Sequence, residues 1–252
     1  MNRTQGLYLG IGAAAGFFGG LVGLGGGIVM VPMLTGMAGF SQRRAHGTSL
    51  AALVFTGMAG AATYAFSGAV DFLAAGALAA TAVLSAGAGA RSAHRLPADK
   101  LKRYFGIFQL GVAALLIAKP WLIHGSVPGV WSKIFWLLAA GAATGFLSGM
   151  MGVGGGSIMV PAMVLLAGMG QHVAQGSSLL AMVPAGIAGA AAHNRLGNVA
   201  GEALWWLLPG IAAGAFAGGM AAAAIDADWL RALFACVLIY MGGRYATSSA
   251  KN

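Results

Sequence analysis

The chain contains a long internal repeat. Residues 16–34 read GFFGGLVGLGGGIVMVPML, and residues 145–163, 129 positions later, read GFLSGMMGVGGGSIMVPAM. The register continues without a gap into the following segment, where GTSL at 47–50 corresponds to GSSL at 176–179. A duplication of this length predicts a molecule built from two halves of the same fold, an N-terminal repeat over 1–125 and a C-terminal repeat over 126–252.

The composition places both halves in a membrane. Only 8% of the 252 residues are charged, 59% are hydrophobic, and the mean hydropathy is +0.82. A water-soluble domain carries about 25% charged residues, so this chain cannot cover a globular surface in water. The single Cys236 excludes a disulfide framework and a thiolate metal cluster. We expect no metal or cofactor, and a duplicated apolar chain with matching glycine breaks is typical of secondary transporters.

Each half is predicted to hold one glycine-broken apolar element followed by three membrane spans. The broken elements cover about 5–39 and 134–169, and the spans cover about 48–67, 72–90, 103–118, 177–192, 203–223 and 229–243. We therefore expect an all-α integral membrane protein. The apolar stretch that follows the N-terminus continues past residue 34 without a cleavage pattern, which indicates a retained membrane element rather than a signal peptide.

Two topologies are compatible with these segments. If each broken element enters and returns as a helical hairpin, the halves are inverted repeats; if it crosses once, the halves are parallel. The hairpin model places 11 Lys and Arg residues on one side and 3 on the other, whereas the single-crossing model divides them 8 to 6. The positive-inside rule favours the first division. It predicts inverted repeats with both termini in the cytoplasm, although a steeply bent crossing stays possible. The net charge of +9 then reflects orientation rather than nucleic-acid binding.

The pattern GxxGxGGGxxxVP occurs at 20–32 and again at 149–161. It resembles the signature of the TauE/SafE family, also called the sulfite exporter family, and the resemblance covers essentially the whole chain. It implies export or uptake of sulfur-containing or small organic anions across a bacterial inner membrane, without an ATP-binding domain.

The glycine triplets are the main candidate substrate site. Glycine tolerates backbone angles that break a helix, and the half-helix that follows begins with N–H groups that have no intrahelical partner. These N–H groups and the helix dipole favour an anion. The candidate residues are Gly25, Gly26, Gly27, Gly154, Gly155 and Gly156, and the two breaks are expected to meet near the membrane midplane. The alternative is that the glycines only allow close helix packing.

Polar residues that precede the next span of each half are further candidates. Thr48, Ser49, Ser177 and Ser178 would either cap the N-terminus of that helix or offer hydroxyl groups to the anion. His46 and Gln175 share a repeat position and could donate to an oxyanion. His46 could also carry a coupling proton, because imidazole changes charge near neutral pH. The neighbouring arginines favour a solvated loop end instead.

Three other polar residues are harder to interpret. Tyr64 and His193 share a repeat position near a helix end, where anchoring at the membrane interface is the favoured role. Gln109 lies inside an apolar run, where a polar side chain is expensive and often functional.

The sequence therefore predicts a transporter of a small anion that works by alternating access of its two halves. An anion channel could use the same site, and a sensory membrane protein is a third possibility. The chain carries no HExxH motif and no paired intramembrane aspartates, which argues against an intramembrane enzyme. The particular anion, the transport direction, the coupling ion and the oligomeric state do not follow from the sequence.

Overall fold

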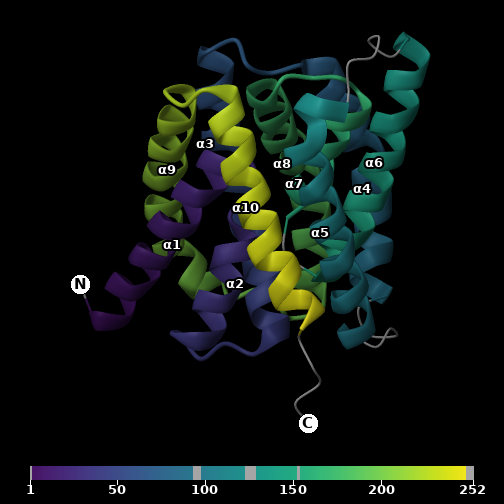
Figure 1. The fold of residues 1–252 in the computed structure, drawn as a ribbon. Coiled ribbons are helices and arrows are strands. Elements are labelled where there is room, and N and C mark those ends of the chain that lie inside the picture. Colours follow the sequence, from purple (N-terminus) through teal and green to yellow (C-terminus); the bar gives the residue numbers. More distant parts are fainter. Residues whose placement is uncertain (1, 93–97, 123–128, 152–153, 248–252) are drawn as a thin grey trace.

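The computed structural model describes residues 2–92, 98–122, 129–151 and 154–247, and every regular element in these ranges is helical. The first half contains α1 (Arg3–Val22), α2 (Gly27–Gly36), α3 (Gln42–Phe66), α4 (Phe72–Ser92) and α5 (Ala98–Leu122) (Figure 1). The second half contains α6 (Val130–Met151), α7 (Gly156–Pro161), a π-helical turn η1 (Ala162–Leu166), α8 (Gln171–Arg195), α9 (Gly201–Ala223) and α10 (Ala227–Ala246). The expected all-helical fold is confirmed.

The helices follow the sequence repeat closely. An offset of 129 residues carries both ends of α3 onto both ends of α8, and it carries the first residues of α4 and α5 onto those of α9 and α10. The same offset relates α1 to α6, and α2 to α7 with η1. Any difference between the halves therefore lies in their side chains and in details of the backbone, not in the order of their elements.

Six helices in the described part of the chain are long and apolar enough to cross a membrane: α1, α3, α4, α6, α8 and α9. The helices α5 and α10, which were also expected to be spans, do not belong to this group. In α10, Asp228 and Arg231 near the start and Arg244 near the end lower the mean hydropathy of the helix. Two segments, α2 and α7 with η1, are apolar but shorter.

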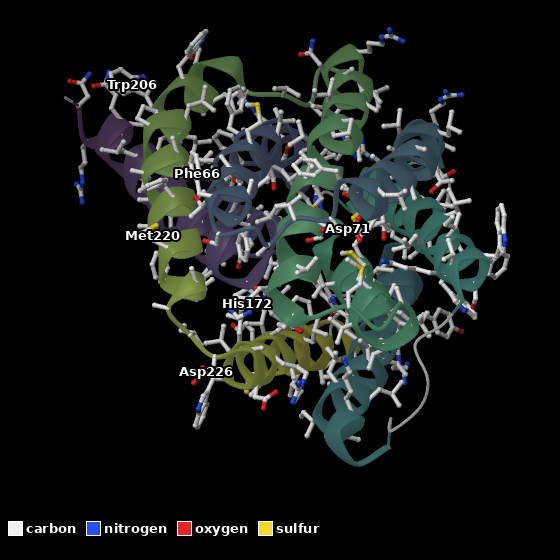
Figure 2. The ribbon with its side chains drawn as sticks, turned by 90° about the horizontal axis from the view of Figure 1, so that it is seen from above. Phe66, Asp71, His172, Trp206, Met220 and Asp226 are labelled. Atoms are coloured by element: carbon white, nitrogen blue, oxygen red, sulfur yellow. The ribbon has the colours of Figure 1, made fainter. Side chains whose placement is uncertain are left out.

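Large apolar side chains cover the outside of the bundle. Trp131, Trp205 and Trp229 are 85%, 75% and 73% exposed, and Figure 2 shows Trp206 and Met220 at the periphery, on α9. Such a surface is unfavourable in water and suits lipid, with tryptophan preferring the membrane interface. Together with the six apolar helices, it indicates a multi-pass membrane protein.

The long helices of one half pack on those of the other half through glycine. Gly12, Gly16 and Gly20 of α1 lie against Leu207, Ile211 and Ala215 of α9, so these two helices run parallel. In the same way, Gly141, Gly145 and Gly149 of α6 lie against Leu78, Ala82 and Ala86 of α4. A Cβ atom at any of these six glycines would overlap the backbone of the neighbouring helix. Small residues thus permit the close backbone approach that membrane helices use for association.

The repeat-related helices α3 and α8 cross antiparallel in the middle of the molecule. Gly60 of α3 lies against Leu179 of α8, whereas Gly189, ten residues further along α8, lies against Leu50 of α3. Figure 1 shows α10 running toward the end of the molecule that holds both termini. The start of α5 faces the last turn of α10, where the rings of Phe105 and Tyr245 are 6.3 Å apart, so α5 and α10 also run antiparallel.

After the first glycine break, the chain returns along α1. Gly26 lies against the Ala15 backbone, and the Phe40 ring beyond the end of α2 lies edge-on to Tyr8, 6.1 Å away. The following helix, α3, begins six residues earlier than predicted from hydropathy, because Ser41 caps it by accepting a hydrogen bond from the Arg44 N–H. The polar residues at 42–46 therefore belong to the helix and not to a loop.

Candidate functional site at the two glycine breaks

The first break depends on glycine at three positions. Gly23, Gly25 and Gly26 have φ angles of 73°, 76° and 76°, a left-handed conformation that costs other residues strain. In the second break Gly154 has φ 87°, but Gly155 has φ −91° and ψ −11°, which other residues adopt readily. Gly27 and Gly156 are the first residues of α2 and α7. The two breaks are therefore similar but not identical.

The two breaks touch each other in the core. A Cβ atom on Gly156 would overlap the carbonyl oxygen of Gly23, and one on Gly154 would lie 2.6 Å from the carbonyl oxygen of Leu24. The described glycines of both motifs are buried. Backbone from residue 23 and backbone from residue 156 thus lie together although they are far apart in the sequence, which agrees with the expectation that the breaks meet.

Polar side chains of α3 and α8 surround the first break. The Ser178 hydroxyl donates to the Gly23 carbonyl at 2.8 Å, and the Gln175 side chain packs on Gly23. The Tyr64 hydroxyl lies 2.8 Å from Gln175 Oε1, to which it donates, and 3.2 Å from the Gly20 carbonyl. Gln175 is fully buried and its Nε2 has no partner within the protein. One strong donor therefore stays unused beside the break.

The second break has different neighbours at the equivalent positions. His193 takes the place of Tyr64, and its Nε2 is 3.0 Å from the Gly149 carbonyl, the counterpart of Gly20. His46 takes the place of Gln175 and is half-buried, and Ser49, the counterpart of Ser178, is fully buried. The Gly155 N–H points at the Met182 sulfur at 3.3 Å, which is a weak acceptor.

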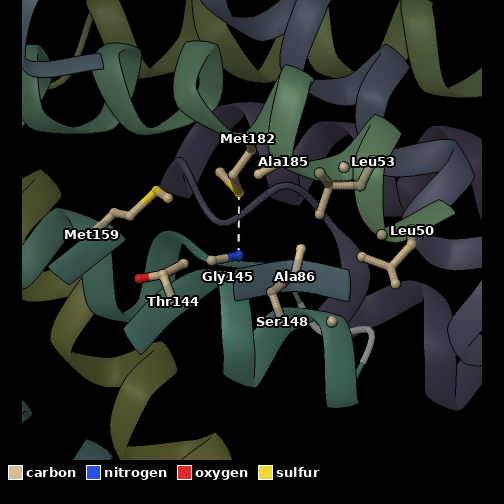
Figure 3. A pocket seen from close by; sticks show the side chains of 13 residues that line it. Leu50, Leu53, Ala86, Thr144, Gly145, Ser148, Met159, Met182 and Ala185 are labelled. Atoms are coloured by element: carbon tan, nitrogen blue, oxygen red, sulfur yellow. Dashed lines mark hydrogen bonds between the residues drawn. The ribbon is translucent and has the colours of Figure 1, made fainter. Parts of the chain in front are cut away.

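A small cavity lies against the second break. Its volume is about 10 Å³, and it is lined by side chains of α3, α4, α6, α7 and α8, among them Thr144, Ser148, Met159 and Met182 (Figure 3). A space of this size accommodates about one water molecule. Thr144 is 1% exposed and its hydroxyl has no partner within the protein. The cavity is therefore bounded by the Gly155 backbone, by the unpaired Thr144 hydroxyl and by the flexible side chains of Met159 and Met182.

Two of the predicted site residues have another role in this structure. Thr48 accepts a hydrogen bond from the Ala200 N–H at 3.0 Å, and Ser177 accepts one from the Asp71 N–H at 2.8 Å. Ala200 and Asp71 immediately precede α9 and α4, and they are themselves related by the repeat. Each hydroxyl thus holds the start of a helix in the opposite half. Neither residue caps its own helix, because α3 and α8 begin several residues earlier.

The expectation that Tyr64 and His193 anchor the protein at the interface is wrong. They are only 2% and 4% exposed, since the helices around them enclose the ends of α1 and α6. Sequence reasoning also missed Thr144 and Ser157, which are buried polar residues without a partner. A comparison of the two repeats position by position would have found them, because their counterparts are Ala15 and Ile28.

The sequence is similar to that of known membrane proteins. Residues 8–246 match the family model described as sulfite exporter TauE/SafE. The chain is 29% identical to the probable membrane transporter protein YunE of Bacillus subtilis, over 92% of this chain and 96% of that protein. A probable membrane transporter protein of Haemophilus influenzae is 32% identical over 46% of each chain. One from Xylella fastidiosa is 31% identical over 69% of this chain and 68% of that protein.

No solved structure matches the chain significantly. The family model nonetheless covers almost all of the sequence, including both glycine breaks and every helix that surrounds them. The relatives that match over most of their length are membrane transporters by name, in agreement with the apolar helical bundle. The chain belongs to the TauE/SafE family of membrane transporters.

Proposed function

We propose that this protein is a secondary transporter, an exporter of sulfite or of a related sulfur-containing or small organic anion. The substrate would bind between the two glycine breaks, and the two halves would expose it alternately to either side of the membrane. The observation that carries the proposal is the backbone contact between residues 23–24 and 154–156, which joins the two broken elements at one place. The family name supports sulfite as the first substrate to test.

We infer that the halves are inverted repeats with re-entrant hairpins. Repeat-related helices that lie side by side and antiparallel, as α3 and α8 do, support an axis in the membrane plane. The return of the chain from Gly26 to Phe40 along α1 supports a hairpin. Non-helical backbone at this depth is tolerable because protein surrounds it.

Charge supports an orientation with both termini in the cytoplasm of a bacterial cell, in the inner membrane. The start of α1 and the end of α10 lie toward one end of the molecule, where α3 begins (Figure 1). The described arginines at that end are Arg3, Arg43, Arg44, Arg91, Arg103, Arg195 and Arg244, whereas Lys119, Lys133 and Arg231 belong to the helix ends on the opposite side. The positive-inside rule places the first group in the cytoplasm.

The proposed ligands are neutral donors. The N–H groups at Gly25–Gly27 and Gly154–Gly156, the Ser49 hydroxyl and the Gln175 amide would face the anion. The Ser178 hydroxyl would turn from the Gly23 carbonyl to the anion, while Thr48 and Ser177 keep α9 and α4 in place beside it. His46 would either donate to the anion or carry the coupling proton. An anion held by preorganised N–H groups needs no formal positive charge.

Flux in proteoliposomes tests the proposal. We would measure uptake of sulfite, sulfate, thiosulfate, a small alkyl sulfonate and acetate, with and without a proton gradient. Saturable flux of one of these anions that responds to the gradient supports a coupled carrier. Flux that does not saturate and follows only the electrical potential would instead identify an anion channel. Protein that is folded but moves none of these anions contradicts the proposal.

A further inference from the structure

Three buried polar side chains lie on α7, which follows the second glycine break, or on helices that contact α7. Gln109 on α5, Thr144 on α6 and Ser157 on α7 are 0%, 1% and 1% exposed. Neither amide atom of Gln109 and neither hydroxyl has a hydrogen-bond partner within the protein. Gln109, Thr144 and Ser157 form the polar trio.

The repeat supplies an internal control for the polar trio. The equivalent positions in the other half hold Leu238 on α10, Ala15 on α1 and Ile28 on α2, and all three are apolar. Helix packing therefore does not require polar residues at these positions, since apolar residues fill the equivalent places in the same fold. Groups that are buried, polar and unpaired lower stability, so their presence at these three positions and not at the three equivalent ones points to a ligand.

The trio lies on α7 and on two helices that contact α7. Ser157 directly follows Gly156, and the helices that carry Thr144 and Gln109, α6 and α5, both contact α7. Thr144 also lines the cavity beside Gly155, together with Ser148, whose counterpart in the first half is Gly19 (Figure 3). All three residues of the trio thus lie on α7 or on helices that contact it, whereas the unused Gln175 amide lies beside the first break.

Resting on the proposed function, we propose that the polar trio forms the anion-head subsite of the substrate site and selects monovalent oxyanions. The trio consists of neutral donors, and the described charged residues of α5, α6 and α7 stand at helix ends. Without a buried cation, the cost of removing an ion from water grows with the square of its charge, about fourfold from a monoanion to a dianion. A sulfonate, a hydrogensulfite or a carboxylate suits such a site, and sulfate does not.

The substrate enters by displacing methionine. A cavity of about 10 Å³ is too small for a sulfonate head, and two of its walls are the side chains of Met159 and Met182. Unbranched thioether side chains change conformation at little cost. When Met182 moves, the Gly155 N–H loses its weak acceptor and becomes available to the anion.

The test compares matched variants in the same transport assay. Thr144→Val and Ser157→Ala remove a hydroxyl at nearly constant volume, and Gln109→Leu introduces the residue of the equivalent position. We expect each variant to raise the KM for methanesulfonate about tenfold, the size of one hydrogen bond to an anion. Thr56→Val is the control, because the Thr56 hydroxyl bonds to the Ala52 carbonyl of its own helix at 3.4 Å. Its KM should match that of the unmodified protein.

Two readouts separate the outcomes. Each variant is melted in detergent with and without methanesulfonate, so that loss of folding is distinguished from loss of binding. If the unmodified protein transports methanesulfonate and the trio variants resemble Thr56→Val in KM and in ligand-induced stabilisation, the trio is not the subsite. If sulfate is transported as well as methanesulfonate, the selectivity for monoanions is wrong. If the unmodified protein neither transports nor is stabilised by any tested anion, the proposed function itself fails, and this inference fails with it.

Discussion

At the first glycine break, α1 presents Ala15 and Gly19; at the second, α6 presents Thr144 and Ser148 at the same repeat positions. The first break has three glycines in the left-handed conformation and is packed against Ala15. The second break has an ordinary backbone at Gly155 and a small cavity. The helix that leads into the first break thus presents small apolar residues to it, whereas the helix that leads into the second break presents two hydroxyl groups.

This difference is the reason for proposing a single anion-head subsite at the second break. Both halves need the same helix order so that α1 can pack on α9 and α6 on α4. That packing does not fix the side chains beside the breaks, since Ile28 after the first break corresponds to Ser157 after the second. The following predictions test how far the two breaks differ.

The largest expected effect is on the first break. Gly26→Ala places a side chain in a left-handed position and against the Ala15 carbonyl, which belongs to a rigid helix. We expect this variant to lose more than about 2 kcal/mol of stability, and transport with it. Gly155→Ala has an ordinary φ and meets only the Thr144 methyl group, so it should lose about 1 kcal/mol.

Thermal unfolding in detergent measures both losses. The added change Thr144→Ala should restore the stability of Gly155→Ala, because it removes the atom that the new Cβ meets. Equal destabilisation by Gly26→Ala and Gly155→Ala would contradict the described difference between the breaks.

A second prediction concerns the buried pair at the first break. Tyr64→Phe leaves both polar atoms of Gln175 without a partner, and we expect a loss of about 1–3 kcal/mol. The double variant Tyr64→Phe, Gln175→Met should be more stable than Tyr64→Phe alone, because apolar groups then replace both partners. A double-mutant cycle by thermal unfolding gives the coupling, and an additive result would show that the Tyr64–Gln175 bond does not contribute.

The third prediction concerns Thr48 and Ser177, at which substitutions should lower the stability of the protein equally. Thr48→Val removes the acceptor of the Ala200 N–H, and Ser177→Ala removes that of the Asp71 N–H. Each variant should lose about 1 kcal/mol, since the two bonds are repeat-related and both are buried or partly buried. Unfolding of the two single variants under one condition makes the comparison. A loss in only one of them would mean that the symmetry of the backbone does not extend to these contacts.

The smallest expected effect comes from an ion pair without a counterpart. Lys133 of α6 lies 3.2 Å from Asp71, which precedes α4, and the repeat places Thr4 and Ala200 at the equivalent positions. Partial burial raises the pKa of the Asp71 carboxyl, but the Ala74 N–H and the Lys133 ammonium outweigh it and lower the pKa below 3.8. Since the folded pKa is the lower one, this stabilisation is present above about pH 4 and is lost as the pH falls further.

Lys133→Met should therefore lower stability by less than about 1 kcal/mol at pH 7, because the pair is partly exposed. The difference from the unmodified protein should shrink as the pH falls below about 4. Melting curves between pH 7 and pH 3 follow it. A difference that stays constant over this range would assign the effect to packing of the Lys133 side chain rather than to the charge pair.

Much of the fold follows from local patterns. Hydropathy and the 129-residue offset predict an all-helical membrane protein with two equivalent halves, and the glycine triplets predict where the helices break. Hydropathy predicts too late a start for α3, because the polar run at 42–46 resembles a loop. In the structure Ser41 caps a helix that includes this run. The roles of Thr48 and Ser177 were also missed, since their partners are more than 100 residues away in the sequence.

The sequence alone determined that the protein lies in a membrane, that its fold is duplicated and that it belongs to the TauE/SafE family. Composition and motifs are properties of the chain and do not depend on contacts between distant segments. Only the tertiary structure decided that the two breaks touch, that Tyr64 and His193 are buried, and that the unpaired hydroxyl of Thr144 lies beside a cavity. The physical reason is that burial and hydrogen-bond pairing depend on neighbours from distant segments. Two positions that correspond in the repeat can therefore differ in environment even where their helices match residue for residue.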